Sequence, residues 1–271
     1  MAYTTIDNPA LHFNAVTWTG TGDATTTVSG VGFQPDWVWI KNRSVGDDHA
    51  LFDAVRGVEK ILFSNATNAE STNTESLTAF NADGFVTGNH RATGGDSGNG
   101  MVSWNWLGAN GTASNSDGSI TSTVSANTTA GFSIVSYTGT GSAGTLGHGL
   151  SAVPKMIILK ERVGTENWMV YHAGNTSAPE TDYLLLNTTS ATADYPVWND
   201  TAPTSSVFSI GSDSSTSTSG DTYIAYCFAE KKGYSKFGSY TGNGNADGTF
   251  VYTGFKPAWV MGKATSRADV W

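Results

Sequence analysis

Two kinds of apolar strand recur along this chain, and both predict β-structure. Residues 102–106 (VSWNW) place bulky side chains on one face and Ser and Asn on the other, and residues 224–228 (IAYCF) repeat this alternation. A period of two with one bulky face is typical of a sandwich strand, so we expect that face to point into its own sandwich. The smaller residue Cys227 then lies on the opposite face, as a buried structural residue.

Residues 37–40 (WVWI) and 156–159 (MIIL) are instead apolar on both faces, and each run ends at a lysine. One face of an antiparallel sheet normally meets water. These strands therefore predict that something covers the outer side of each sheet, either a long loop or a neighbouring domain.

The lysine strands belong to a block that occurs three times. An aromatic–Thr–Gly opening at Trp18, Tyr137 and Tyr240 is followed, always 23 residues later, by Lys41, Lys160 and Lys263. Residues 64–67 and 186–189 also correspond, at the offset of 122 that relates the two alternating strands. A tandem array of one folding unit is the expected architecture.

The repeats divide the chain into five parts, and room for roughly eight strands in each full repeat predicts jelly-roll or lectin-like sandwiches. In order, they are an arm (residues 1–12), unit one (13–111), a Ser/Thr/Asn/Gly-rich linker (112–131), unit two (132–233) and an incomplete third repeat (235–271), here called segment three.

Segment three contains three expected strands, at residues 235–240, 249–253 and 258–263. Three strands without a second sheet cannot bury their apolar face, and open strand edges invite pairing. Docking on unit two, completion by a partner chain or continuation of a longer array would each solve this, and we favour the partner chain. The predicted assembly interface comprises Phe250, Tyr252, Phe255, Trp259, Val260 and Trp271.

Composition supports the all-β prediction and narrows the function. Charged residues are 14% of the 271 residues, and the net charge of −9 argues against nucleic-acid binding. We find no membrane-spanning stretch and no signal peptide in the amino-acid sequence, and the single cysteine excludes an internal disulfide. We expect an extracellular or virion-surface location.

Two stretches of unit one resemble a family of tailed-phage virion proteins from aquatic bacteria, usually labelled tail-fibre or structural proteins. They are GVGFQPDWVWIKNR, from residue 30, and HALFDAVRG, from residue 49. The opening TIDNPALHFNAVTWTG is similar as well, whereas unit two matches loosely. The resemblance implies a lectin-like β-sandwich with a fibrous or surface role, and brings no established catalytic residues.

Candidate catalytic groups are sparse. His49 with Asp48 and Asp53 is the sharpest set, but unit two does not share it, and Glu161 with Glu166 has no counterpart in unit one. The acidic residues form no calcium loop, and the single cysteine rules out a zinc–thiolate set. We therefore predict no enzyme activity, no cofactor and no metal.

Glycans are candidate ligands of this protein or candidate modifications of its asparagines. Asn65 and Asn187 are sequons at equivalent positions of the two units, where a shared turn is the simpler interpretation. Trp168 and Trp198 lie outside the clearest core strands and are candidates for stacking on sugars.

Three hypotheses follow. The favoured one is a non-enzymatic structural protein, a subunit of a fibre or phage appendage that polymerises with copies of itself head to tail by strand complementation. The alternatives are a lectin-like adhesin that binds surface glycans and, more remotely, a glycan-degrading enzyme.

Overall fold

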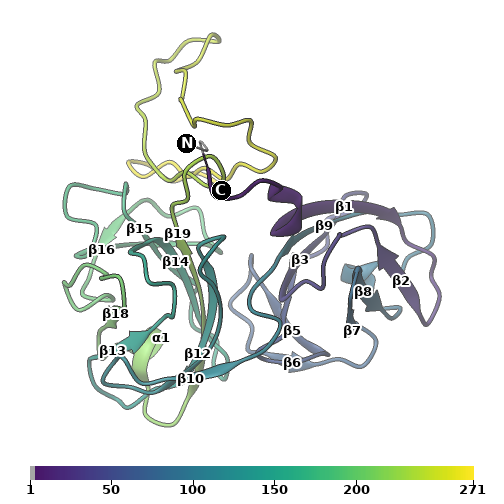
Figure 1. Ribbon diagram of the computed structural model, residues 1–271, viewed down its shortest axis with the longest axis horizontal. Coiled ribbons are helices and arrows are strands. Elements are labelled where there is room, and N and C mark those ends of the chain that lie inside the picture. The colour runs from purple at the N-terminus through teal and green to yellow at the C-terminus, as the bar shows by residue number, and fades with distance from the viewer. Residues whose placement is uncertain (1–3) are drawn as a thin grey trace.

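A computed structural model describes residues 4–271 and shows an all-β chain in which two antiparallel sandwiches stand side by side (Figure 1). The arm contains a short 3-10 helix, η1 (Pro9–Leu11), begun by Asn8, whose side chain accepts a hydrogen bond from the Ala10 N–H. Ile6 of the arm is buried. No helix among the described residues is both long and apolar enough to cross a membrane.

Unit one is a sandwich of a six-stranded and a three-stranded sheet. Its elements are β1 (Phe13–Thr19), β2 (Thr26–Ser29), β3 (Trp37–Asn42), β4 (Ala50–Asp53), β5 (Lys60–Phe63), β6 (Ser71–Thr72), β7 (Leu77–Asn81), β8 (Gly84–Thr87), the 3-10 helix η2 (Arg91–Thr93) and β9 (Gly100–Trp106). The larger sheet has the order β1-β9-β3-β4-β5-β6 and the smaller one β2-β8-β7.

Unit two is built in the same way, from an eight-stranded and a two-stranded sheet. Its elements, with those of the preceding linker, are β10 (Ala113–Asn115), β11 (Ser122–Asn127), β12 (Phe132–Thr138), β13 (Gly144–Gly147), β14 (Pro154–Glu161), β15 (Met169–His172), β16 (Asp182–Leu185), β17 (Ala193–Asp194), β18 (Val207–Ile210), the helix α1 (Ser214–Ser217) and β19 (Thr222–Ala229). The larger sheet has the order β10-β11-β12-β19-β14-β15-β16-β17.

The strand orders show that the sequence repeat is a structural repeat. From β12 onward the larger sheet of unit two follows the order of unit one strand for strand, and the β13-β18 pair corresponds to β2-β8. In both units the first strand pairs antiparallel with the last, Phe13 opposite Trp106 and Phe132 opposite Phe228. The all-β sandwich fold predicted from the sequence is confirmed.

The expected linker is part of unit two. Strands β10 and β11 extend its large sheet beyond β12, with Val124 opposite Val135. Ile120 and Val124 are buried in the core of unit two. The branched side chains within this Ser/Thr-rich segment favour a strand wherever one face can be buried. The linker-like composition of the segment shows only that its other face is polar.

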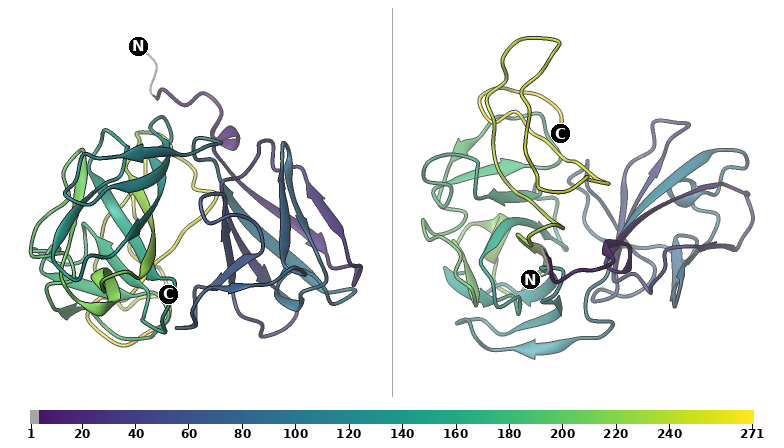
Figure 2. Two further views of the ribbon diagram at one scale, coloured as in Figure 1. Left: turned by 90° about the horizontal axis from the view of Figure 1, so that it is seen from below. Right: turned by 45° about the horizontal axis from the view of Figure 1, so that its top comes forward.

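Strands β3 and β14 are buried on both faces, as their sequences predict, and of the two possible covers, a long loop or a neighbouring domain, the structure shows the neighbouring domain. In β3, Val38 and Ile40 point into unit one, while Trp37 and Trp39 join a second core that lies between the units. The two large sheets face each other across this inter-unit core, and the smaller sheets form the outer layers (Figures 1 and 2).

The bulky faces of β9 and β19 point to the inter-unit core, so the sequence-based assignment of these faces to the units' own interiors was wrong. Trp106, Tyr226 and Phe228 lie in the inter-unit core, whereas Asn105 and Cys227 are buried on the opposite face. Alternation identifies two faces, but it cannot say which one is internal when both are covered. Burial also raises the pKa of the Cys227 thiol, as expected for a structural cysteine.

Segment three contains no strand, contrary to the three predicted from its sequence. In the complete units the first three strands never pair with one another: β1 and β3 pair with β9, and β2 pairs with β8. Residues 235–271 repeat only the part of the unit that holds those first three strands. Their ladder partners are therefore missing from the described residues, and the segment runs as loops over unit two (Figure 1).

Candidate assembly interface

The three repeated lysines clamp the loop that follows each of them. The Lys41 ammonium donates to the Asp47 carbonyl at 2.5 Å, and that of Lys160 donates to the Gly164 carbonyl at 3.4 Å. In segment three Lys263 donates to the Asp269 carbonyl. Burial lowers the pKa of Lys160 to about 8, partly offset by the nearby carboxylates. The repeated lysine is thus a structural group, and its loop forms in segment three even without strands.

The repeated asparagines fix the residue at which the clamped loop ends. The Asn65 side chain accepts from the His49 N–H at 2.8 Å and donates to Asp48 at 2.7 Å. In unit two Asn187 accepts from the Trp168 N–H at 2.9 Å and donates to the Asn167 side chain at 2.8 Å. The two asparagine side chains hydrogen-bond equivalent loops, which explains why asparagine is repeated at this position. Glycan attachment at Asn65 and Asn187 stays a prediction.

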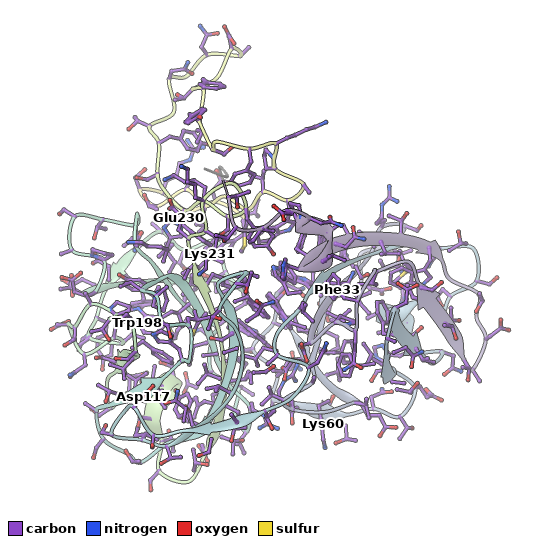
Figure 3. The ribbon with its side chains drawn as sticks, viewed as in Figure 1. Phe33, Lys60, Asp117, Trp198, Glu230 and Lys231 are labelled. Atoms are coloured by element: carbon purple, nitrogen blue, oxygen red, sulfur yellow. The ribbon has the colours of Figure 1, made fainter. Side chains whose placement is uncertain are left out.

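The indole of Trp168 crosses from unit two to unit one. It is fully buried and donates to the Phe63 carbonyl, the last residue of β5, at 2.9 Å. Trp198 is 1% exposed and packs edge-on against Tyr171 inside unit two (Figure 3). Neither ring has a face open to a sugar, so the proposed glycan contacts at these two tryptophans were wrong. Position outside a core strand does not imply exposure when a second core lies between the units.

Aromatic side chains dominate the inter-unit core. Trp37 of unit one stacks on Tyr226 of unit two, with ring centroids 4.3 Å apart and planes at 20°. Its ring also stacks at 5.7 Å on Phe132. Buried aromatic rings each remove about 150–250 Å² from water. This contact therefore resembles a domain core more than a transient interface.

A buried ionic network borders that core. Arg56 pairs with Asp53 and, at 3.0 Å, with Glu70, while Arg162 of unit two binds both oxygens of Glu70 at 2.8 and 3.0 Å. Burial alone would raise the pKa of Glu70, but the hydrogen bonds and charges of Arg162 and Arg56 hold it below its usual value. Tyr226 donates to Asp53 at 2.8 Å. The network joins the two units.

Segment three is anchored at a few points and otherwise exposed. Trp259 is half-buried, with its ring edge-on to Trp106 at 5.5 Å, and Trp271 donates its indole N–H to the Leu185 carbonyl at 2.7 Å. Of the remaining residues predicted for the interface, Phe255 is half-buried, and Phe250, Tyr252 and Val260 are 85%, 74% and 77% exposed. The predicted set thus divides into anchors and open apolar side chains.

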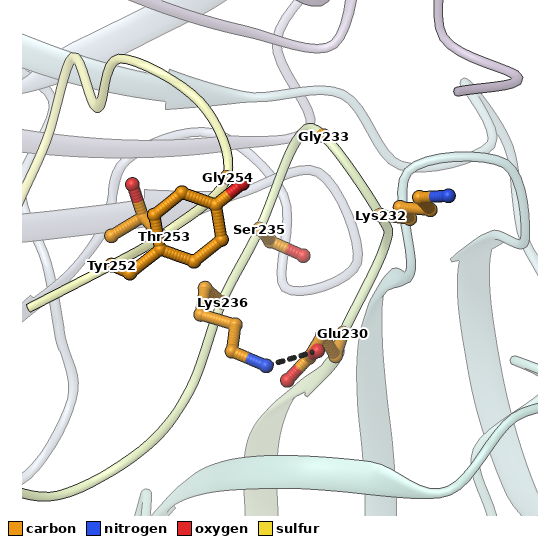
Figure 4. Close-up of a pocket in the computed structure, with 8 residues that line it drawn as sticks. All are labelled: Glu230, Lys232, Gly233, Ser235, Lys236, Tyr252, Thr253 and Gly254. Atoms are coloured by element: carbon orange, nitrogen blue, oxygen red, sulfur yellow. Dashed lines mark hydrogen bonds and ion pairs between the residues drawn. The ribbon is translucent and has the colours of Figure 1, made fainter. Parts of the chain in front are cut away.

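A pocket of about 170 Å³ lies where segment three leaves unit two (Figure 4). Its lining includes Tyr252 and an exposed ion pair in which Lys236 contacts Glu230 at 2.8 Å. The hydroxyl of Ser235, also in the lining, donates to the Ala229 carbonyl at 3.2 Å. The pocket thus marks the junction of segment three with unit two.

Each member of the first catalytic candidate set, His49 with Asp48 and Asp53, has another partner. Asp53 pairs with Arg56 in the inter-unit network, and Asp48 accepts from Asn65. Burial and the Lys41 charge lower the pKa of His49 to about 4, and its Nδ1 accepts from the Trp39 indole at 3.3 Å. Among residues 4–271, no group of three or more His, Cys, Asp or Glu side chains is arranged to hold a metal ion.

These features define a class: a tandem β-sandwich protein whose two complete repeats share an inter-unit core and whose partial third repeat is docked without strands of its own. Residues 8–271 match the model of a domain family of unknown function, DUF7483, and the chain belongs to that family. No curated protein and no solved structure matches the chain significantly.

Proposed function

We propose that the protein is a non-enzymatic structural protein whose copies join head to tail through segment three, as subunits of an extracellular fibre or a phage appendage. One observation carries the proposal. Of the eleven large apolar side chains that are exposed among residues 4–271, six lie in this segment of 37 residues, at Tyr240, Phe250, Val251, Tyr252, Val260 and Val270. Such a concentration of exposed apolar surface is typical of an interface.

The backbone of the segment supports the same proposal. Residues 249–253 and 258–263 have strand-like sequences but no ladder partner among the described residues. Unpaired strand-forming segments are completed readily by addition to another chain. A contact between unlike surfaces that does not close on itself generates filaments. The resemblance of unit one to tailed-phage virion proteins supports a virion-surface location.

Electron microscopy of the purified chain, with light scattering after chromatography, tests the proposal. We expect filaments or a concentration-dependent ladder of oligomers from the intact chain. Deleting residues 235–271 should leave a folded monomer, because the two sandwiches keep their shared core. Polymers that survive this deletion would overturn the proposal.

Point variants separate apolar contacts from a general effect of the deletion. Changing Phe250, Tyr252 and Val260 together to Ser should weaken assembly at least tenfold without changing the fold. The matched control changes Val163 and Leu11, which are 57% and 50% exposed but lie outside the segment, to Ser. Equal loss of assembly in both sets would argue against a role for the segment.

A further inference from the structure

Segment three binds unit two through the same groups by which unit two binds unit one. Trp168 and Trp271 both stand eight residues after a repeated lysine. The Trp168 indole N–H donates to the carbonyl of Phe63, which ends β5, and that of Trp271 donates to the carbonyl of Leu185, which ends β16. β5 and β16 occupy equivalent places in the two large sheets.

A backbone hydrogen bond is repeated in the same way. The Glu70 N–H of unit one donates to the Arg162 carbonyl of unit two at 2.8 Å, and the Thr192 N–H of unit two donates to the Thr265 carbonyl of segment three at 3.0 Å. Arg162 and Thr265 each stand two residues after a repeated lysine, and Glu70 and Thr192 are related by the repeat offset of 122. Two independent contacts thus describe one interface, used twice.

Unit one differs from the two later repeats at the tryptophan position. The residue equivalent to Trp168 and Trp271 is His49, whose Nδ1 is engaged by Trp39 of the same unit. The Trp-bearing docking loop is therefore carried by unit two and segment three, and among residues 4–271 only segment three presents it without strands of its own.

We propose that residues 235–271 are an exchangeable docking element, which in the assembly binds unit two of a neighbouring copy instead of its own. This inference rests on the proposed head-to-tail assembly and adds a second contact to it. The contact comprises the carbonyl of Leu185 and the N–H of Thr192 on the acceptor, and Trp271 and Thr265 on the incoming segment. Exchange of an identical element between copies is a low-cost route to oligomers. It preserves the contacts of the segment when unit one of the same neighbouring copy also receives Trp259 on its Trp106.

The first part of segment three, which joins unit two to the docked part, has the length and exposure that exchange requires. Residues 238–252 are all exposed, and among them Phe250 and Tyr252 are two of the most exposed apolar side chains. Fifteen residues can span up to about 50 Å when extended. The docked contact also lacks the ion pair of its counterpart, since Thr192 and Thr265 replace Glu70 and Arg162. The segment is thus held by a smaller set of interactions and can be released without unfolding either unit.

Cysteine pairs at the repeated backbone contact test the exchange. Full-length Thr192→Cys and Thr265→Cys chains are mixed, unfolded, refolded together and oxidised, and disulfide-linked peptides are identified by mass spectrometry. A disulfide can join these two chains only when the segment of one copy lies on unit two of the other. The matched control mixes Glu70→Cys with Arg162→Cys, at the equivalent contact inside the shared core. The only native cysteine, Cys227, is buried.

We expect the 192–265 mixture to give a cross-linked heterodimer in at least a tenfold excess over the 70–162 mixture. If the intact protein assembles but the 192–265 heterodimer is absent, and a doubly substituted chain closes its disulfide only within itself, the exchange is overturned while head-to-tail assembly by another surface stands. A protein that never assembles overturns the proposed function and this inference together.

Discussion

Unit two and segment three contact the preceding repeat through equivalent groups, yet they are held very differently. Unit two presents its large sheet to unit one, so that the indole of Trp168 is fully buried within the aromatic core. Segment three has no sheet, and its Trp271 is half-buried at the edge of that core. The hydrogen-bonding positions therefore set where a repeat docks, and the apolar area behind them sets how firmly it is held.

Substitution of Trp37 should give the largest difference in stability between the two contacts. Trp37→Ala removes a fully buried ring that stacks on Tyr226, and should reduce the free energy of unfolding by about 3–5 kcal/mol. Trp259→Ala, at the equivalent position of segment three, should cost less than half as much because its ring is half-buried. Urea denaturation of both variants checks the order; equal losses would mean that segment three is as firmly packed as unit two.

The charges of the inter-unit contact should make it sensitive to acid. Glu70→Gln weakens hydrogen bonds to two arginines, with an expected cost of about 1.5–3 kcal/mol at pH 7. The pKa of Glu70 is lowered in the folded state, so its contribution is complete above the ordinary value of 4.5 and is lost as the pH falls through the lower folded value.

Denaturation curves of the wild type and Glu70→Gln, recorded between pH 7 and pH 3, measure this contribution. The difference in stability between the two proteins should shrink as the solution is acidified. A difference that stays constant over that range would contradict the ionic account. Thr192→Ala is the matched control in the contact of segment three, where no carboxylate is present at this position, and its effect should not vary with pH.

The repeats and the sandwich fold could be predicted from the sequence because both follow from regular spacings of residues along the chain. The strands at residues 37–40 and 156–159, apolar on both faces, also predicted a covering neighbour correctly. The direction of each face could not be predicted in the same way. Val102–Trp106 alternation is identical whether the bulky side meets its own small sheet or the other unit, and only the long-range arrangement of the two units decides between them.

The candidate site was only partly visible from the sequence. Five side chains of segment three were predicted to be exposed because the segment lacks a second sheet. Phe250, Tyr252 and Val260 are exposed, whereas Phe255 and Trp259 are half-buried. Trp168 was misjudged because its burial depends on Phe63, 105 residues away in the other unit. A signal was nevertheless present: Trp168 and Trp271 share one distance from the repeated lysine, and extending the alignment of the repeats past that lysine would have paired them.

The smallest expected loss of stability comes from removing the indole hydrogen bond that both contacts share. Trp168→Phe and Trp271→Phe each remove one indole N–H and keep an aromatic ring. The first leaves the Phe63 carbonyl without its donor in a buried site and should cost about 1–3 kcal/mol in global stability. The second removes the donor to the Leu185 carbonyl at a half-buried site and should change global stability by less than about 1 kcal/mol.

Amide hydrogen exchange shows which contact each of the two variants opens, in addition to how much stability it loses. Trp271→Phe should speed exchange at Thr192 and Asp269, whose N–H groups hydrogen-bond across the docked contact, and leave the strands of both sandwiches protected. Trp168→Phe should instead speed exchange across the inter-unit contact, including the N–H of Glu70. If Trp271→Phe opened both contacts alike, segment three would be an integral part of the shared core, because an exchangeable element must be able to leave unit two while unit one and unit two stay joined.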